Sequence, residues 1–315
     1  MMDEQMSGSA FQTFFRRAAF AATASALLAG CGIFSGSEKP KTPTVGNRTP
    51  ILSNIATEIV ADPSLASVAV VLPPAQVNTE WAQAGGNAAK STGHLALGNA
   101  PQPAWTANIA GTSKRERLAA APVIGNGTLY AVDTNGAVNA FDAATGARRW
   151  TYQLELERSL RSTSFGGGVT YFEGKVYATS GTGDVIALDA ATGAEIWRVK
   201  PAGPLRGAPT VAFNAVYVMT QDNQIFSLNL ADGSVVWQDA AGAGEAGVFG
   251  VATPAAAQGT VIAGYSSGEL VAYRYENGRV LWSDALARTS ISTSVSTLTD
   301  VDADPIIDSG RVYAL

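Results

Sequence analysis

The chain has 315 residues, 46% apolar and 15% charged, which is enough to form a sizeable core and argues against a disordered chain. The net charge of −5 and the scattered basic residues argue against nucleic acid as a partner, because phosphate binding needs clustered Lys and Arg. A single histidine, His94, and a single cysteine, Cys31, are too few for a zinc site or a catalytic Cys–His pair.

Residues 1–30 have the pattern of an export signal. Arg16 and Arg17 precede an apolar run from Ala18 to Gly30. As a helix this run would be about 20 Å long, too short for the roughly 30 Å core of a bilayer, so it fits the apolar region of a signal peptide. The Arg-Arg pair leaves export by either the Sec or the twin-arginine route open.

The motif LLAGC, which ends at Cys31, resembles the lipobox of bacterial lipoproteins. The resemblance implies that residues 1–30 are removed, that Cys31 is lipidated, and that the lipid anchor alone holds the protein on the membrane. Gly32 in place of Asp implies the periplasmic face of the outer membrane. The alternative is an ordinary signal with an incidental cysteine. Residues 31–75 begin rich in Gly, Ser, Pro and Lys, and we expect a flexible tether and N-terminal extension.

From residue 76 to residue 315 the chain carries an internal repeat. Tryptophans stand at 105, 150, 197, 237 and 282, and the last four each follow a glycine by four residues. The repeat positions are Asp142, Gly146 and Trp150; Asp189, Gly193 and Trp197; Gly233 and Trp237; and Gly278 and Trp282. Asn229 and Arg274 replace the aspartate in the last two repeats.

Upstream of each repeat glycine, apolar and polar residues alternate with a period of two, which indicates β-strands. Asn135-Gly136 is a strong hairpin signal, because a type I′ turn needs positive φ at both central residues. Four short antiparallel strands per 40–47 residues predict an all-β protein built of β-propeller blades. The expected repeats span about 118–152, 165–199, 208–240 and 250–284, with the start of a fifth at 300–315.

The recurring tryptophans are best explained by packing. Burying one indole removes roughly 150–250 Å² from water, an upper contribution of roughly 4–6 kcal/mol. A cofactor would use one or two aromatic rings and not one in every repeat. We therefore expect Trp150, Trp197, Trp237 and Trp282 to pack between neighbouring sheets.

The motif A-x-D-x-x-T-G-x-x-x-W, at Ala140–Trp150 and Ala187–Trp197, resembles the tryptophan-docking repeat of quinoprotein (PQQ) dehydrogenase-like propellers. Those dehydrogenases have eight blades, a calcium ion and adjacent cysteines beside the quinone. This sequence has no adjacent cysteines and no recognisable acidic calcium cluster. We therefore expect no cofactor, no metal and no enzymatic activity.

Two further segments narrow the resemblance: LRGAPTVAFNAVYV from Leu205 and TDVDADPIIDSGRVYAL from Thr299. With the lipobox and W-x-Q-x-G-G-N at Trp81–Asn87, they are similar to the BamB family of outer-membrane barrel-assembly lipoproteins. The resemblance covers roughly residues 50–315 and implies a scaffold in the assembly machinery that binds periplasmic domains of the barrel-inserting subunit BamA.

The resemblance carries four partner-binding residues over to this chain, namely Leu205, Arg206, Asp300 and Asp302. An exposed Leu-Arg pair would supply an apolar anchor and a bidentate donor, and the aspartates would accept from a basic partner. The family has a leucine where Gly203 stands here, so that contact is in doubt. The alternative is that Arg206 pairs with Asp300 or Asp302 and that Leu205 fills a gap between blades.

Two other functions remain open from the sequence: a PQQ-dependent dehydrogenase-like quinoprotein, and a generic periplasmic propeller that binds sugars or peptides. The sequence also ends in GRVYAL, which aligns with the first arm of each earlier hairpin. We expect an incomplete, open arc of about four blades plus part of a fifth. The segment near Trp105 would then be a closing strand whose hosts lie beyond residue 315.

Overall fold

The computed structural model describes residues 62–111, 118, 120–154, 167–242, 252–286 and 300–315. The chain divides into two units, Met1–Val70 and Val71–Leu315. The described part of the first unit holds one 3₁₀ turn, Pro63–Leu65, whose Ser64 amide donates to the Asp62 side chain at 2.9 Å. Cys31 and the export signal lie outside the described residues. No described helix is long and apolar enough to cross a bilayer.

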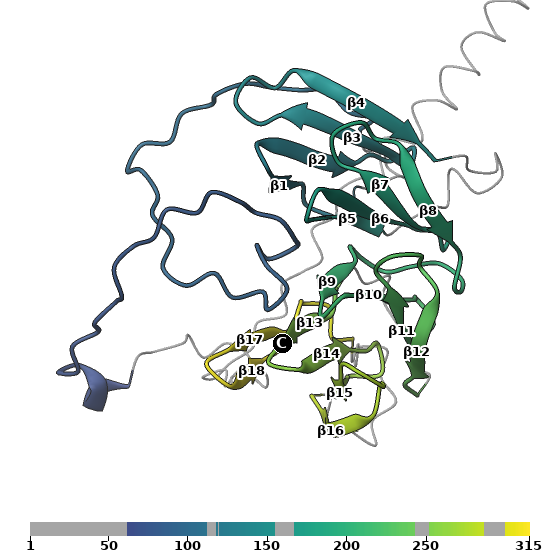
Figure 1. Cartoon of the computed structure of the whole chain (residues 1–315). Helices are drawn as coiled ribbons and strands as arrows, with labels where there is room; N and C mark the ends of the chain where they lie inside the picture. The colour runs from purple at the N-terminus through teal and green to yellow at the C-terminus, as the bar shows by residue number, and fades with distance from the viewer. Residues whose placement is uncertain (1–61, 112–117, 119, 155–166, 243–251, 287–299) are drawn as a thin grey trace, which may run out of the picture. The chain divides into compact units, whose positions relative to one another are not determined.

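The second unit contains four antiparallel sheets of four strands each, which confirms the predicted all-β blades (Figure 1). The first sheet is β1 (Val123–Gly125), β2 (Thr128–Val132), β3 (Ala137–Asp142) and β4 (Arg148–Gln153). The second is β5 (Gly167–Phe172), β6 (Lys175–Ser180), β7 (Val185–Asp189) and β8 (Glu195–Val199). The third is β9 (Thr210–Ala212), β10 (Ala215–Met219), β11 (Gln224–Asn229) and β12 (Val235–Ala240). The fourth is β13 (Ala255–Ala257), β14 (Thr260–Gly264), β15 (Glu269–Arg274) and β16 (Val280–Ala285), and a hairpin of β17 (Ile306–Asp308) and β18 (Arg311–Tyr313) follows.

The first strand of each sheet contacts the first strand of the next, from β1 through β5, β9 and β13 to β17. Between successive sheets lie apolar clusters, centred for example on Val176 and Leu188, and on Val216 and Phe226. In the second and third sheets, which each have a neighbouring sheet on either side, the residues of the second and third strands are therefore mostly buried on both faces.

The turn before each fourth strand has the geometry that the repeat predicts. In the first sheet the Asp142 carboxylate accepts hydrogen bonds from the amides of Ala144 and Thr145, and Gly146 has φ +73°. The Arg149 guanidinium and these turn donors lower the pKa of Asp142 to about 2. Asp189 repeats the arrangement with Thr192. A β-bulge follows at the same place in each of the four sheets.

Each docked indole lies against the repeat glycine of the following sheet. A Cβ at Gly193 would lie 2.7 Å from Cδ2 of Trp150, and Gly146, Gly233 and Gly278 hold Trp105, Trp197 and Trp237 equally closely. Each indole Nε1 also donates to a backbone carbonyl three residues before that glycine, at 2.8–3.2 Å. Packing is therefore confirmed for Trp150, Trp197 and Trp237.

The expectation for Trp282 is wrong. Its side chain is 40% exposed, and no repeat turn among the described residues lies against its ring. No strand is assigned to the described residues around Trp105, although the Trp105 ring does dock on Gly146, and the closing strand stays a prediction. This ring packs through its turn contact and the Ala143 carbonyl and not through a sheet of its own.

Candidate functional site

The base of the candidate site is a segment that runs across the first strands of the four sheets and of the β17–β18 hairpin, which we count as the fifth sheet. We call residues 81–91 the strap. Its backbone carbonyls accept amide hydrogen bonds from one residue in each of four first strands: Trp81 from Ile124, Ala82 from Tyr171, Ala88 from Ala256 and Ala89 from Ile307. The amide of Trp81 also donates to the Ile124 carbonyl, at 2.8 Å.

The remaining first strand, β9, is held by a side chain of the strap. Gln83 is buried; its Nε2 donates to the Val211 carbonyl at 2.9 Å, and its Oε1 accepts from the Val211 amide at 3.0 Å. Between the two halves of the strap the chain turns at Gly85 and Gly86, which have φ +71° and +94°. A Cβ at Gly86 would lie 2.6 Å from Cγ2 of Thr92, so the turn requires glycine.

At the end of the strap lies a buried lysine. The Lys90 ammonium donates to the Ala84 carbonyl at 2.9 Å and lies 4.0 Å from Oδ2 of Asp304. Burial lowers the pKa of Lys90 to about 8, against the opposing effect of Asp304. The ammonium therefore connects the strap to the segment from residue 300 to 304, which we call the acidic loop.

The acidic loop is fastened to three parts of the protein. The Asp300 carboxylate accepts from Arg206 at 2.9 Å. The Val301 amide donates to the Tyr265 carbonyl, and the Val301 side chain fills the space a Cβ would occupy at Gly264. Asp304 accepts from the Thr253 amide at 2.7 Å. The loop is thus held by Arg206, which lies between the second and third sheets, by residues next to the strands of the fourth sheet, and by the strap.

The structure brings the four predicted partner-binding residues close together, but three of the four are buried. Leu205 is fully buried, and the side chains of Arg206 and Asp300 are 1% and 3% exposed. The expectation of an exposed Leu-Arg pair is therefore wrong. Leu205 packs in the core between the second and third sheets, and Arg206 forms the internal ion pair that was the alternative. Partner contact stays a prediction.

Only Asp302 offers its side chain to solvent, with 49% of it exposed. Its Oδ1 lies 3.8 Å from Nη2 of Arg206. Partial burial and the neighbouring Asp300 carboxylate raise the pKa of Asp302, and Arg206 opposes this rise. The arrangement therefore presents Asp302 as the most exposed acidic side chain of the loop, since Asp300 is buried and 29% of the Asp304 side chain is exposed.

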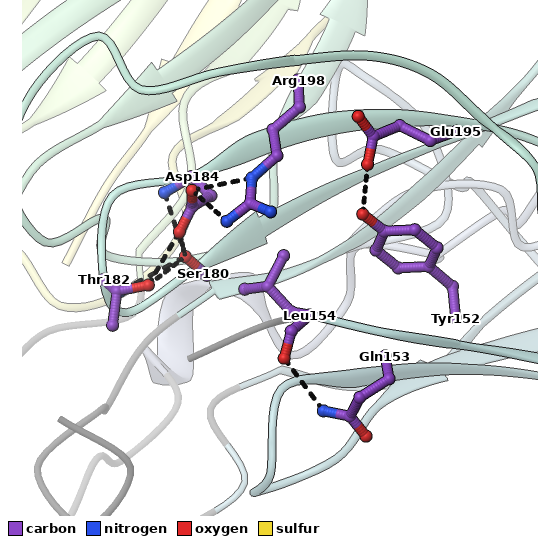
Figure 2. Close-up of polar contacts among 8 residues, drawn as sticks. All are labelled: Tyr152, Gln153, Leu154, Ser180, Thr182, Asp184, Glu195 and Arg198. Atoms are coloured by element: carbon purple, nitrogen blue, oxygen red, sulfur yellow. Dashed lines mark hydrogen bonds and ion pairs between the residues drawn. The ribbon is translucent and has the colours of Figure 1, made fainter. Parts of the chain in front are cut away.

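A second polar cluster, which the sequence did not reveal, lies at the end of the second sheet (Figure 2). The Asp184 carboxylate accepts from Ser180 and Thr182 and binds Nε and Nη2 of Arg198 at 3.0 and 2.8 Å. These donors lower the pKa of Asp184 against the effect of its burial. Tyr152 of the first sheet donates to Glu195 of the second. All these groups are satisfied within the protein, so the cluster joins strands and offers no open ligand position.

Sequence reasoning also did not single out three residues of the site: Gln83, Lys90 and Asp304. The W-x-Q-x-G-G-N motif pointed to the segment but not to its contacts, since Gln83 and Val211 are 128 residues apart. Within the described ranges, no three His, Cys, Asp or Glu side chains are grouped so that they could hold a metal ion.

Lys90 gives a testable pH dependence. The unfolded chain binds this proton with a pKa near 10.5 and the folded chain with a pKa of about 8, so stability rises with pH between these values. Relative to K90M, the wild-type free energy of unfolding should rise by about 2 kcal/mol between pH 7.5 and 9.5. Urea unfolding of both proteins at both pH values measures this change. If the difference in free energy of unfolding between wild type and K90M were the same at both pH values, the assigned environment of Lys90 would be wrong.

Comparisons of the sequence with a family model and with curated proteins agree on one family. The model of a family described as outer membrane protein assembly factor BamB matches residues 97–156 and 135–315. The BamB protein of Vibrio cholerae is 35% identical over 215 residues, which is 68% of this chain and 55% of that protein. The BamB protein of Escherichia coli is 29% identical over 256 residues and is matched over 56% of its length. The chain spans about half the length of the curated relatives it matches.

Solved structures agree on the fold. BamB from Moraxella catarrhalis superposes with a TM-score of 0.55 at 25% identity, covering 65% of this chain and 60% of that one. A europium-containing methanol dehydrogenase gives a TM-score of 0.55 at 17% identity, over 75% of this chain and 53% of that one. At 17% identity the dehydrogenase shares the fold alone.

Proposed function

Because the chain belongs to the BamB family of outer membrane protein assembly factors, we propose that it is a non-catalytic scaffold of the barrel-assembly machinery. In this proposal Cys31 is lipidated and tethers the protein to the periplasmic face of the outer membrane. The partner is a BamA-type barrel-inserting protein, bound through its periplasmic domains together with other subunits of the machinery.

The exposed Asp302 carboxylate on the acidic loop carries the proposal. We assign Asp302 to direct contact with a basic group of the partner, because a half-exposed carboxylate can accept charge-assisted hydrogen bonds without leaving its loop. Arg206 and Asp300 contribute to partner binding indirectly, because their ion pair holds the loop in place, and Leu205 contributes by packing in the core next to Arg206 in the chain. In this proposal the acidic loop contacts the partner through Asp302, and the buried residues behind it hold the loop in place.

Asp302→Asn tests this assignment. The change removes the charge and keeps the shape of a surface side chain, so the thermal midpoint should not move. Affinity for the purified periplasmic domains of a BamA-type protein should fall about 3- to 10-fold, measured by surface plasmon resonance at low salt. Asp284→Asn, an equal change at an exposed aspartate on β16, is the matched control. Equal binding by D302N and wild type would remove Asp302 from the contact.

A further inference from the structure

The five amides that the strap engages occupy one equivalent position in five separate sheets. Ile124, Val211, Ala256 and Ile307 are each the middle residue of a three-residue first strand. Tyr171 is likewise one residue from the end of β5, and it pairs with β6 as Ile124 pairs with β2. The strap therefore supplies one acceptor per sheet, in the order of the sheets along the chain.

These amides have a physical need for a partner. A first strand pairs with its own sheet on one side only, so its outward amides form a free edge. A buried amide without an acceptor costs about 1–3 kcal/mol. Four strap carbonyls and the Gln83 side chain meet this need, and the second half of the strap begins only after the Gly85-Gly86 turn has redirected the chain.

The second half of the strap is also joined to the acidic loop and its hairpin. Ala89 accepts from the Ile307 amide, Lys90 lies beside Asp304, and Ser91 donates to Asp308 at 2.7 Å. Three consecutive strap residues thus hold the segment that begins at Asp300. The acidic loop has no hydrogen bonds among the described residues that would fix it relative to the first two sheets without Arg206 and the strap.

We infer that residues 81–91 are a positioning element for the partner site, in which Lys90 holds the acidic loop and Ser91 holds the β17–β18 hairpin that follows it, so that Asp302 faces the partner. This inference rests on the proposed function, since Asp302 is the residue assigned to contact. The group of the partner that Asp302 contacts is still expected to be basic.

Two strap variants and one control test the inference. K90M keeps the bulk of the buried side chain and removes the cation beside Asp304, and S91A removes the hydrogen bond to Asp308. Gln102→Leu changes an exposed residue outside the strap. Hydrogen exchange should accelerate at the Thr253 and Ile307 amides in the strap variants, about 3- to 10-fold, while amides of β6 and β7 keep their wild-type rates.

Affinity for the BamA-type periplasmic domains should fall about 3- to 10-fold in both strap variants and stay unchanged in Q102L. Exchange that accelerates equally throughout the protein would overturn the inference, because it would show a general loss of stability. Unchanged exchange and affinity in S91A, with or without a folded K90M, would overturn it as well. If wild type does not bind these domains, the proposed function fails, while the exchange pattern still decides whether the strap holds the loop.

Discussion

Replacing Arg206 with methionine should lower the free energy of unfolding by about 3–5 kcal/mol. The guanidinium is 1% exposed and donates to an Asp300 carboxylate that is 3% exposed. Methionine fills much of the same volume, but it leaves Asp300 as a buried charge without its partner. Urea unfolding monitored by tryptophan fluorescence measures the change, which is large relative to the stability of a typical domain.

The double variant R206M/D300L provides the control. Nε and Nη1 of Arg206 and Oδ2 of Asp300 have no hydrogen-bond partner among the described residues, so the pair is incompletely satisfied. Removing both charges should therefore recover most of the stability lost in R206M. A double variant as unstable as R206M would show that the packing of Arg206, and not its pairing with Asp300, is what stabilises the protein.

Gly193→Ala should destabilise the protein by about 3–4 kcal/mol through two effects. The residue has φ +75°, where a Cβ is strained, and the new Cβ would lie 2.7 Å from Cδ2 and Cε3 of Trp150. The indole must move, and its hydrogen bond to the Ala190 carbonyl is lost with it. The shift of the tryptophan emission maximum and the thermal midpoint together measure the effect.

Gly174→Ala is the matched control for Gly193→Ala. Gly174 has φ +76°, but a Cβ there would have no atom within 4 Å. This variant therefore reports the backbone strain alone, about 1–2 kcal/mol. If the two variants were equally destabilised, the docking of Trp150 against Gly193 would contribute nothing to stability.

The repeat and its strands could be predicted from the sequence because their causes are local. Alternation of period two and the fixed distance from Gly146 to Trp150 each act within a few residues, and the structure has them as expected. The Asn135-Gly136 pair does lie between β2 and β3, but only Gly136 has a positive φ, +75°, so the predicted type I′ turn is wrong. Packing of the indoles between sheets was predicted from the need of thin sheets to cover their faces, but the docking partner, the repeat glycine of the following sheet, was not predicted.

The candidate site could be predicted only in part, because its contacts join distant residues. Arg206 and Asp300 are 94 positions apart, and nothing near either residue indicates that both are buried. The strap has no period and no regular strand, so its role appears only when the five first strands are seen together. The exposure of Trp282 likewise depends on what lies against it and not on the repeat itself.

Each docked indole lies on the sheet that follows it in the chain, so the contacts between sheets all run in the same direction along the sequence. The indoles of the first three sheets dock on the second, third and fourth sheets, so these contacts link each sheet only to its nearest neighbour. The strap adds a link of another kind, since one short peptide touches every sheet at once. We therefore expect the described sheets to unfold together and not one after another, which would also keep the acidic loop in place until the whole array unfolds.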